Sequence, residues 1–315
     1  MNNSFKSKVP LFIVKVLDTI QLLTNFFFNR KKITGKHKYE EPFFIIGCGR
    51  SGNTLLRSML VAGGEVAIPP ESYVWPRIIR IFQTYNFLPW EKLCSLIIAE
   101  FEAYKEFYTW EVNLYIAHKN ARILKGKEQT LSNIINEVYK AYQLEKTGKI
   151  KRWGDKTPIN TLYIDKILKV YPNAKFIHIV REPKDVVCSL VKAGLNTNYE
   201  NAANTWVSYV NRAINLRKKL KENQFFEIRY ESLVFDPESE LQSVCKFLGI
   251  NFNSSMLDFY KLKESLGDVK YGKHHENIGK PISTKSIEKW KTILTKDQVR
   301  KVNEKTKQTI ENLSS

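Results

Sequence analysis

The stretch PFFIIGCGRSGNTLLRSML, residues 42–60, decides the fold. Residues 43–46 form a short apolar run that ends at a glycine, which predicts a buried strand. From Thr54 onward the apolar residues recur at helical spacing. The loop between strand and helix has Walker spacing: Gly47, four residues, Gly52, one residue and then threonine. Backbone N–H groups of such a loop, together with the helix N-terminus, bind phosphate.

The loop departs from the nucleoside-triphosphatase pattern at one position. Asn53 stands where a P-loop NTPase has the lysine that contacts the β- and γ-phosphates. The cation is Arg50, inside the loop. A phosphate site of another type is therefore predicted, with a purely structural glycine turn as the alternative. Its residues would be Gly49, Arg50, Ser51, Gly52, Asn53 and Thr54.

Strand-like and helix-like segments alternate along the rest of the chain. Two further strands and two helices are predicted, at 174–180, 225–229, 161–171 and 186–193. This alternation predicts an α/β fold with a central parallel sheet flanked by helices. In such sheets ligands bind outside the carboxyl ends of the strands. Gly47 and Arg181 both fall at such ends.

A second group of anion-binding residues follows the strand predicted at 174–180. Arg181 ends this strand, Pro183 suits the first turn of a helix, and Ser189 lies further along that helix. A guanidinium and a hydroxyl together can hold a phosphate separate from the first. An arginine at a strand end is usually an ion-pair residue, so this interpretation depends on the glycine-rich loop.

Charged residues outside these motifs are candidates for the chemistry. Lys156 lies in the turn WGDKTP before a predicted helix, and Glu71 lies in PPES shortly after the first helix. A solvated lysine and a helix-capping carboxylate are the respective structural alternatives. His274 and His275, on a loop, are alternative proton acceptors. His178 is another, but its place within a predicted strand favours the core.

The segment from Lys280 to Trp290 is basic and rich in hydroxyl groups, with Ser283 and Thr284 in its middle. A loop of this composition can close over a nucleotide anion. A surface loop anchored by its tryptophan is the alternative.

The composition narrows the choice of partners. The chain has 50 Lys and Arg against 32 Asp and Glu, a formal charge of +18. This balance favours anionic partners, although a lysine-rich solvated surface has the same charge. The cysteines are widely spaced and include no C-x-x-C pair, so we expect no zinc site. Cys48, Cys188 and Cys245 lie in apolar or motif surroundings, which predicts buried thiols.

The N-terminal segment is apolar but interrupted. Polar residues at positions 15, 18, 19, 21 and 25 fall along one helical face, and the basic run Arg30-Lys31-Lys32 follows. No apolar run is long enough for a spanning helix. Residues 9–32 are therefore either an interfacial helix on an anionic membrane or a helix packed on the protein's own surface.

Taken together, these motifs resemble the sulfotransferases that use 3′-phosphoadenosine 5′-phosphosulfate (PAPS), over about residues 42–305. The chain looks most similar to the tyrosylprotein and bacterial branch. Asn53 departs from the family motif, where a threonine is usual, and residues 77–150 match nothing transferable. The resemblance lies in GRSGNT at 49–54, Glu71-Ser72, GDKTP at 154–158, Arg181 with Ser189, RYESL at 229–233 and the segment 280–290.

The resemblance implies a P-loop-containing, nucleotide-hydrolase-like fold. Residues 41–315 would form the sulfotransferase domain, with a helical acceptor-site insertion at about 77–150. Residues 1–40 would be an amphipathic helix and a basic connector. The resemblance also places the 5′-phosphosulfate on the loop at 47–54 and the 3′-phosphate on Arg181 and Ser189. Tyr230 would lie near the nucleotide, and Lys280 with Ser283 and Thr284 would cover it.

By the same resemblance Glu71 is the general base. Lys156 and Arg50 would stabilise the bridging and equatorial oxygens during in-line transfer, because fixed cations can serve without a metal. The expected acceptor is a hydroxyl of a saccharide, a lipid-linked glycan, a small alcohol or a tyrosine.

Two other functions compete with this interpretation. A P-loop kinase-like phosphotransferase would require the loop lysine and magnesium ligands. A basic nucleic-acid-binding protein would require a basic stripe with aromatic platforms. No such module is recognisable in the sequence, so we expect no nucleic-acid partner. Without a spanning segment or a disulfide framework, we expect a cytoplasmic enzyme, membrane-associated if residues 9–32 bind lipid.

Overall fold

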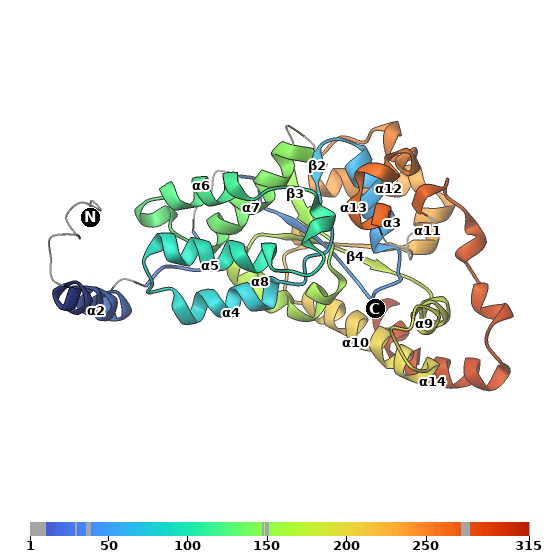
Figure 1. Ribbon diagram of the computed structural model, residues 1–315. Helices are drawn as coiled ribbons and strands as arrows, with labels where there is room; N and C mark the ends of the chain where they lie inside the picture. Colours follow the sequence, from blue (N-terminus) through green and yellow to red (C-terminus); the bar gives the residue numbers. More distant parts are fainter. Residues whose placement is uncertain are drawn as a thin grey trace.

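The computed structural model describes residues 11–28, 30–35, 39–146, 148, 151–271 and 278–314. At its centre is a parallel five-stranded sheet of order β2-β3-β1-β4-β5 (Figure 1). The strands are β1 (Phe43–Ile46), β2 (Val66–Ala67), β3 (Arg152–Asp155), β4 (Lys175–Val180) and β5 (Phe225–Arg229). The predicted α/β class with a central parallel sheet is confirmed, and β1, β4 and β5 lie where the sequence placed them.

Helices surround this sheet. The α-helices are α2 (Leu11–Phe28), α3 (Asn53–Ala62), α4 (Trp75–Tyr85), α5 (Trp90–Glu102), α6 (Tyr115–Ile123), α7 (Leu131–Lys146), α8 (Ile164–Val170), α9 (Pro183–Lys192), α10 (Tyr199–Arg217), α11 (Tyr230–Phe235), α12 (Pro237–Leu248), α13 (Gly267–Tyr271) and α14 (Lys296–Ser314). Short 3-10 turns include η1 (Phe107–Trp110), η3 (Pro158–Tyr163) and η6 (Phe259–Ser265).

Strand β1 lies between β3 and β4, and helices bury both of its faces. Side chains alternate along a strand, so Phe44 and Ile46 pack with α4, α5, α7 and α8, whereas Phe43 and Ile45 pack with α3, α11 and α12. Burying each such side chain contributes roughly 1.5–3 kcal/mol. The continuous apolar run therefore belongs to a central strand, as its composition predicts.

Strand β3 is a correction to the sequence prediction, which interpreted residues 153–158 as a turn. Its four residues are buried although charged residues stand at both ends. The Asp155 carboxylate accepts hydrogen bonds from Asn160 Nδ2 (2.8 Å) and the Tyr139 hydroxyl (2.5 Å). Gly154 has no room for a side chain, since a Cβ there would lie 2.5 Å from the Phe43 ring. Partners distant in sequence therefore stabilise a strand that lacks an apolar run.

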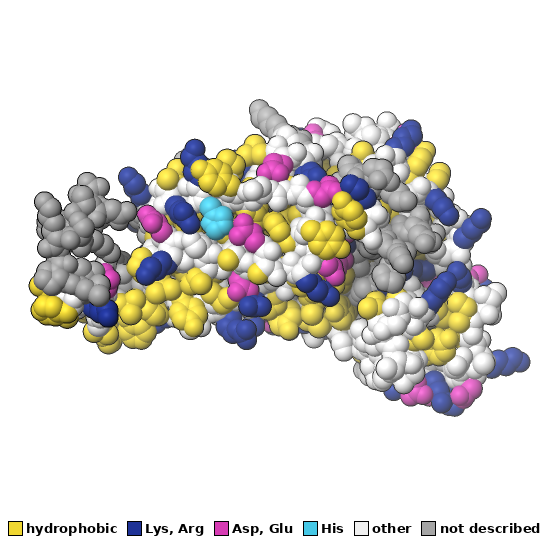
Figure 2. Space-filling view, in the orientation of Figure 1, with side chains coloured by type: hydrophobic (Ala, Val, Ile, Leu, Met, Phe, Trp, Pro, Cys, Tyr) yellow, Lys and Arg dark blue, Asp and Glu magenta, His cyan; other side chains and the backbone are white. Residues whose placement is uncertain are grey.

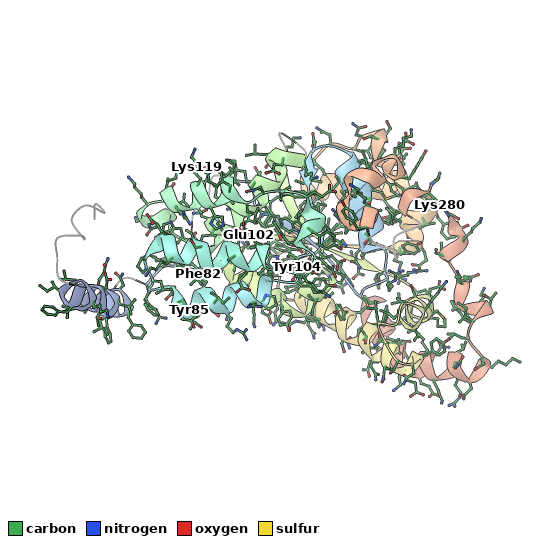
Figure 3. The ribbon with its side chains drawn as sticks, viewed as in Figure 1. Phe82, Tyr85, Glu102, Tyr104, Lys119 and Lys280 are labelled. Carbon is green, nitrogen blue, oxygen red and sulfur yellow. The ribbon has the colours of Figure 1, made fainter. Side chains whose placement is uncertain are left out.

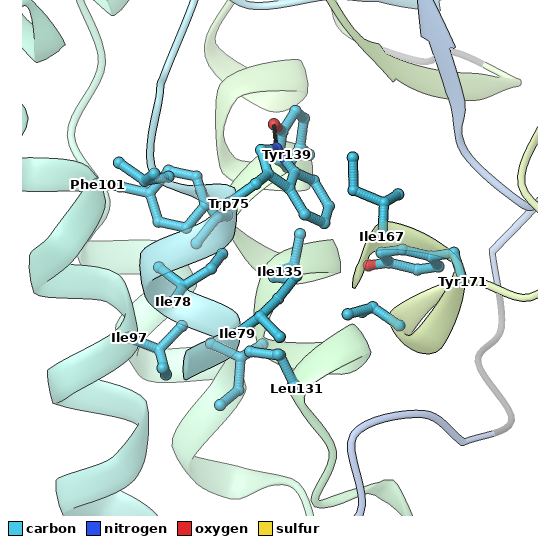
Figure 4. Close-up of a cluster of buried hydrophobic side chains, with 14 of the residues drawn as sticks. Trp75, Ile78, Ile79, Ile97, Phe101, Leu131, Ile135, Tyr139, Ile167 and Tyr171 are labelled. Atoms are coloured by element: carbon cyan, nitrogen blue, oxygen red, sulfur yellow. Dashed lines mark hydrogen bonds between the residues drawn. The ribbon is translucent and has the colours of Figure 1, made fainter. Parts of the chain in front are cut away.

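Helices α4–α7 occupy most of the region expected to build the acceptor site. Their inner faces form a core in which Trp75, Tyr139 and Tyr171 gather among isoleucines (Figure 4). The Trp75 indole N–H donates to the Tyr139 hydroxyl over 3.2 Å. An aromatic core holds these helices to the sheet. The division of the chain at residue 40 stays a prediction.

Helix α2 lies at one end of the molecule, beyond α4 and α5 (Figure 1). The connector after it pairs with the helical region, since Lys31 N donates to the Asn86 carbonyl (2.9 Å) and Ser132 N donates to the Ile33 carbonyl (3.0 Å). The Phe26 ring contacts the Phe87 ring at 5.2 Å. The connector is thus attached to the domain, while most side chains of α2 stay exposed.

Candidate active site

The glycine-rich loop joins β1 to α3 and is shaped by two close approaches. Gly47 and Gly52 have positive φ angles of 146° and 100°. A Cβ on Gly47 would lie 2.5 Å from the Ile179 carbonyl oxygen, and one on Gly52 would lie 2.5 Å from the Tyr230 ring. Asn53 donates from Nδ2 to the Cys48 carbonyl (2.8 Å). The residue that replaces the NTPase lysine therefore closes the loop on itself.

Arg50, Arg181 and Ser189 come together on one side of this loop. Arg181 Nη1 donates to the Arg50 carbonyl (3.1 Å), and Arg50 Nε donates to Ser189 Oγ (3.0 Å). The Arg181 guanidinium stacks on the Tyr230 ring at 4.4 Å. Burial lowers the pKa of Arg50, and the neighbouring charge of Arg181 lowers it further. Two cations held this close to each other favour an anion between them.

Lys156, Glu71 and Thr54 meet on another side of the loop. Lys156 Nζ lies 2.5 Å from Glu71 Oε1 and 3.2 Å from Thr54 Oγ1. The lysine side chain is completely buried. Glu71 follows β2 and Lys156 follows β3, and these strands are neighbours in the sheet. Adjacent strands end at the same edge, which explains why residues so distant in sequence form an ion pair.

Neither structural alternative for this pair holds. Lys156 is not solvated, because its side chain has no exposed surface. Glu71 does not cap α4, which begins at Trp75 after Val74 at the N-cap position. Instead, Ser72 N donates to Thr157 Oγ1 (3.2 Å), so the two segments are joined by backbone as well as by charge.

Two further charged residues extend this cluster, and sequence reasoning missed both. Arg57 on α3 is completely buried; its Nε donates to the Ile68 carbonyl (2.8 Å) and its Nη1 pairs with Asp268. Asp268 Oδ2 lies 3.6 Å from Lys156 Nζ. The one available signal was a charge within the apolar pattern of α3. Nothing local marks Asp268.

Tyrosine side chains lie beside Glu71. Tyr73 has a positive φ of 49° and stacks on Tyr104 at 5.9 Å. Figure 3 shows Tyr104 just beyond α5, on the side of the sheet. Burial raises the pKa of Tyr73 and Tyr104, and the Glu71 charge adds to both shifts. Burial also raises the pKa of Tyr209 to about 12. These phenols therefore stay protonated and can donate hydrogen bonds beside the carboxylate.

The segment 280–290 is attached to α9 through its second half. Asp185 accepts hydrogen bonds from the backbone N–H groups of Glu288 (2.8 Å) and Trp290 (3.0 Å). Arg181 Nη2 donates to the carbonyl of Ser286. The segment is therefore held both by Asp185 and by the arginine that contacts the loop. Sequence reasoning missed Asp185.

The first half of this segment is more distant. Lys280, Ser283 and Thr284 are exposed, and in the described chain no hydrogen bond joins them to the glycine-rich loop. Figure 3 shows Lys280 at the edge of the molecule away from α4 and α5. Their predicted contact with a nucleotide stays a prediction.

The alternative bases have different outcomes. His178 is buried within β4 and its Nδ1 lies 2.9 Å from Glu227 Oε2, which confirms it as a core residue. His274 and His275 lie outside the described residues. Within the described ranges, no group of three His, Cys, Asp or Glu side chains is placed to hold a metal ion.

The comparison with known families decides the identity. The model of a family described as "Sulfotransferase family" matches residues 42–254, more than half of the chain. The chain belongs to the sulfotransferase family. The match contains the loop, Glu71, Lys156, Arg181 and Tyr230, whereas Asp268 and the segment 280–290 lie beyond its end.

Curated relatives of this sulfotransferase act on different acceptors, as their names state. Protein-tyrosine sulfotransferase 2 of Gallus gallus is 25% identical over 266 residues, which cover 81% of this chain and 64% of the relative. Omega-hydroxy-beta-dihydromenaquinone-9 sulfotransferase of Mycobacterium bovis is 24% identical over 255 residues, which cover 67% of this chain and 63% of the relative. The chain thus spans less than two thirds of either relative.

Solved structures confirm the sulfotransferase fold. The sulfotransferase domain of the Synechococcus PCC 7002 olefin synthase superimposes with a TM-score of 0.56 at 20% identity, covering 87% of this chain and 98% of that domain. The sulfotransferase domain of the curacin biosynthetic pathway gives 0.55 at 21% identity, covering 86% and 99%. The predicted enzyme class, a sulfotransferase, is confirmed by the family match and the curated relatives.

Proposed function

We propose that this sulfotransferase takes its sulfuryl group from PAPS and transfers it to a hydroxyl. The observation that carries the proposal is the pair of cationic groups around one loop. Arg50, Arg181 and Ser189 form one group, and Lys156 with Thr54 forms the other. A donor with two separated anionic ends suits this division, because each group would neutralise one end.

Polar atoms in and beside the glycine-rich loop fit such a ligand. Ser51 Oγ and Arg181 Nε are buried and lack hydrogen-bond partners among the described residues. Buried polar atoms are normally satisfied, so these two are donors available to phosphate oxygens. Backbone N–H groups at the start of α3 would hold the 5′-phosphosulfate, while Arg181 and Ser189 would hold the 3′-phosphate.

The reaction forms one bond and breaks one. The acceptor oxygen bonds to sulfur as the bond from sulfur to the 5′-phosphate oxygen breaks, so that 3′-phosphoadenosine 5′-phosphate (PAP) leaves. Glu71 takes the hydroxyl proton. Lys156, adjacent to Glu71, places its positive charge beside the oxygens that gain negative charge. Both groups are preorganised, since their side chains already touch.

The acceptor would approach Glu71 past the tyrosines. Tyr73 and Tyr104 present a stacked aromatic pair at this point, and Tyr209 lies close enough to sense the Glu71 charge. Such a surface suits a hydroxyl carried on an aromatic or apolar body. Tyrosine peptides and lipid alcohols, the acceptor classes named for the two relatives, are therefore the first to screen, before saccharides and small alcohols.

Donor choice is tested by replacing Arg181. Arg181→Ala should weaken PAP binding by about 1.5–3 kcal/mol, the range for a hydrogen bond to a charged group, while ADP, which lacks the 3′-phosphate, should change little. Calorimetry with both ligands measures this. Arg212→Ala removes an equal charge at an ion pair with Asp165 and should alter neither affinity. Equal losses for PAP and ADP would refute the 3′-phosphate role.

We also propose that α2 lies on anionic membranes. No described helix is long and apolar enough to span a bilayer. Yet apolar side chains along α2 stay exposed, for example Ile20 at 54% and Phe27 at 69%. In Figure 2 hydrophobic side chains gather over this end of the molecule, next to dark blue basic ones. An exposed apolar arc beside the basic run 30–32 is typical of an interfacial helix.

Charge substitutions on the two faces of α2 test this proposal. Ile20→Glu with Phe27→Glu should reduce sedimentation with phosphatidylglycerol vesicles about tenfold or more, because each exchange removes roughly 1.5–3 kcal/mol of apolar burial. Thr19→Glu with Gln21→Glu adds the same charge on the polar side of α2 and should reduce sedimentation with the vesicles much less. Equal losses would show attraction by charge alone, and no sedimentation of the unmodified protein would exclude the bilayer as partner.

A further inference from the structure

Four side chains of alternating charge form a continuous row that ends at Glu71 in the site. Arg57, Asp268, Lys156 and Glu71 follow one another, each in contact with the next. They come from α3, from α13, from the end of β3 and from the segment after β2. The two cations are completely buried. Their charges cancel in pairs, so removal of one partner leaves a buried charge uncompensated.

The ion pair between Lys156 and Glu71 cannot persist unchanged through the proposed reaction. When Glu71 takes the acceptor proton, its negative charge disappears. Loss of this charged partner is costly for a fully buried ammonium. Among the described residues, Asp268 is the other carboxylate paired with Lys156, with Oδ2 at 3.6 Å.

Asp268 is itself held in place from two directions. Its Oδ1 pairs with Arg57 and accepts the Val269 backbone N–H (3.1 Å). Arg57 is anchored by its bond to the Ile68 carbonyl (2.8 Å). Because Oδ1 already accepts both of these bonds, Asp268 suits the role of a fixed charge better than that of a proton acceptor.

We infer that Asp268 is a positioning residue: its carboxylate holds the Lys156 ammonium in place while Glu71 is neutralised. The inference rests on the proposed function of Glu71 and Lys156. Asp268 lies beyond the residues matched by the family model, which end at 254. The site therefore depends on a C-terminal segment outside the matched region.

The helical region secures this segment. Glu111 accepts hydrogen bonds from Lys270 Nζ (2.9 Å) and the Tyr271 hydroxyl (2.9 Å), and Lys146 binds its other oxygen (2.8 Å). These bonds lower the pKa of Glu111 to about 2. A side chain on Gly267 would clash with the Thr109 carbonyl. Helix α13 therefore packs tightly against η1, and this packing fixes the position of Asp268 beside Lys156.

A double-mutant cycle tests the inference. Asp268→Asn should lower kcat about ten- to a hundredfold, because displacement of a catalytic group by about 1 Å can cost about a hundredfold. In a Lys156→Met background the same change should cost less than about twofold, since a residue acting through Lys156 has nothing left to position. PAP formation from PAPS is the readout, with the best acceptor from a screen or with water as acceptor.

Controls separate positioning from folding. Asp268→Glu should restore part of kcat, and Asp258→Asn, at an exposed pair with Lys261, should leave kcat unchanged. If Asp268→Asn melts too early to assay, Arg57→Met with Asp268→Asn removes both members of the buried pair and should show the same kcat loss. PAP affinity should stay near that of the unmodified protein in each variant.

The outcomes distinguish this inference from the proposed function. Equal losses from Asp268→Asn in both backgrounds would overturn the inference, as would an unimpaired Asp268→Asn beside an impaired Lys156→Met. An unimpaired Lys156→Met would overturn the role of Lys156 and the inference together. A loss in PAP affinity that accounts for the whole effect would show a binding role instead.

Discussion

Replacing Glu71 by glutamine should lower kcat by at least about a hundredfold and leave nucleotide affinity nearly unchanged. General-base assistance is worth typically ~10²–10⁴ in rate, and glutamine keeps the shape of the side chain but cannot take the proton. The amide oxygen can still accept a hydrogen bond from Lys156, so the structure around the site should survive. Single-turnover kinetics at saturating PAPS, with an acceptor from a screen with labelled PAPS, measures the effect.

A matched control separates loss of the base from loss of an ion pair. Glu100 pairs with Arg77 Nε at 2.6 Å, outside the site. Glu100→Gln breaks a contact of similar length and should keep full kcat. The base would be misassigned if Glu71→Gln retained most activity while replacement of His274 or His275 removed it. The fold and the family would then stand, but the mechanism would have to be rebuilt around the C-terminal loop.

Replacing Lys156 by methionine should lower kcat by about 10²–10³, the cost of losing one preorganised charge-stabilising donor. PAPS binding should weaken as well, because in the proposed mechanism the ammonium faces the donor before transfer begins. PAP lacks the sulfuryl group, so its affinity should fall less. Measuring kcat together with the affinities for PAPS and PAP separates these effects.

A lysine at the opposite end of β3 provides the control for Lys156→Met. Lys151 precedes β3 and pairs with Glu65 at 3.1 Å, with half of its side chain exposed. Lys151→Met should leave kcat and both affinities unchanged, since exposed ion pairs contribute little. If Lys156→Met lowered only the melting temperature and kept kcat, the buried lysine would have a structural role alone.

Elements with local signals were predicted from the sequence, the strands close to their observed limits and the helices less closely: α9 begins at Pro183 and not at 186, and the helix predicted at 161–171 is the turn η3 followed by α8. β1, β4 and β5 are apolar runs, and α3 and α9 follow their strands closely, so the strand ends that carry Gly47 and Arg181 were placed correctly. β2 and β3 were not predicted. They have two and four residues, and β3 contains charged residues whose burial depends on partners such as Tyr139. The hydrophobic periodicity of the sequence does not by itself identify such strands.

The sequence also did not predict the directions of long side chains. Arg50 was assigned to the transferring group because it lies in the loop. In the folded protein Arg50 Nε donates to Ser189 Oγ. The charges of Arg181 and Glu71 both act on the Arg50 guanidinium, and its role at the transferring group stays a prediction. An arginine has several rotatable bonds, and the partner it contacts depends on which helix packs beside the loop.

By itself the sequence determined the glycine-rich loop, the strands beside it and the sulfotransferase resemblance, because each is set by spacing within a few residues. The tertiary structure alone decided which charges meet. The neighbouring positions of β2 and β3 bring Glu71 to Lys156, and the docking of α13 brings Asp268 to Arg57 across 211 residues. Such contacts arise from sheet order and helix packing, which burial of the whole core selects and no local pattern records.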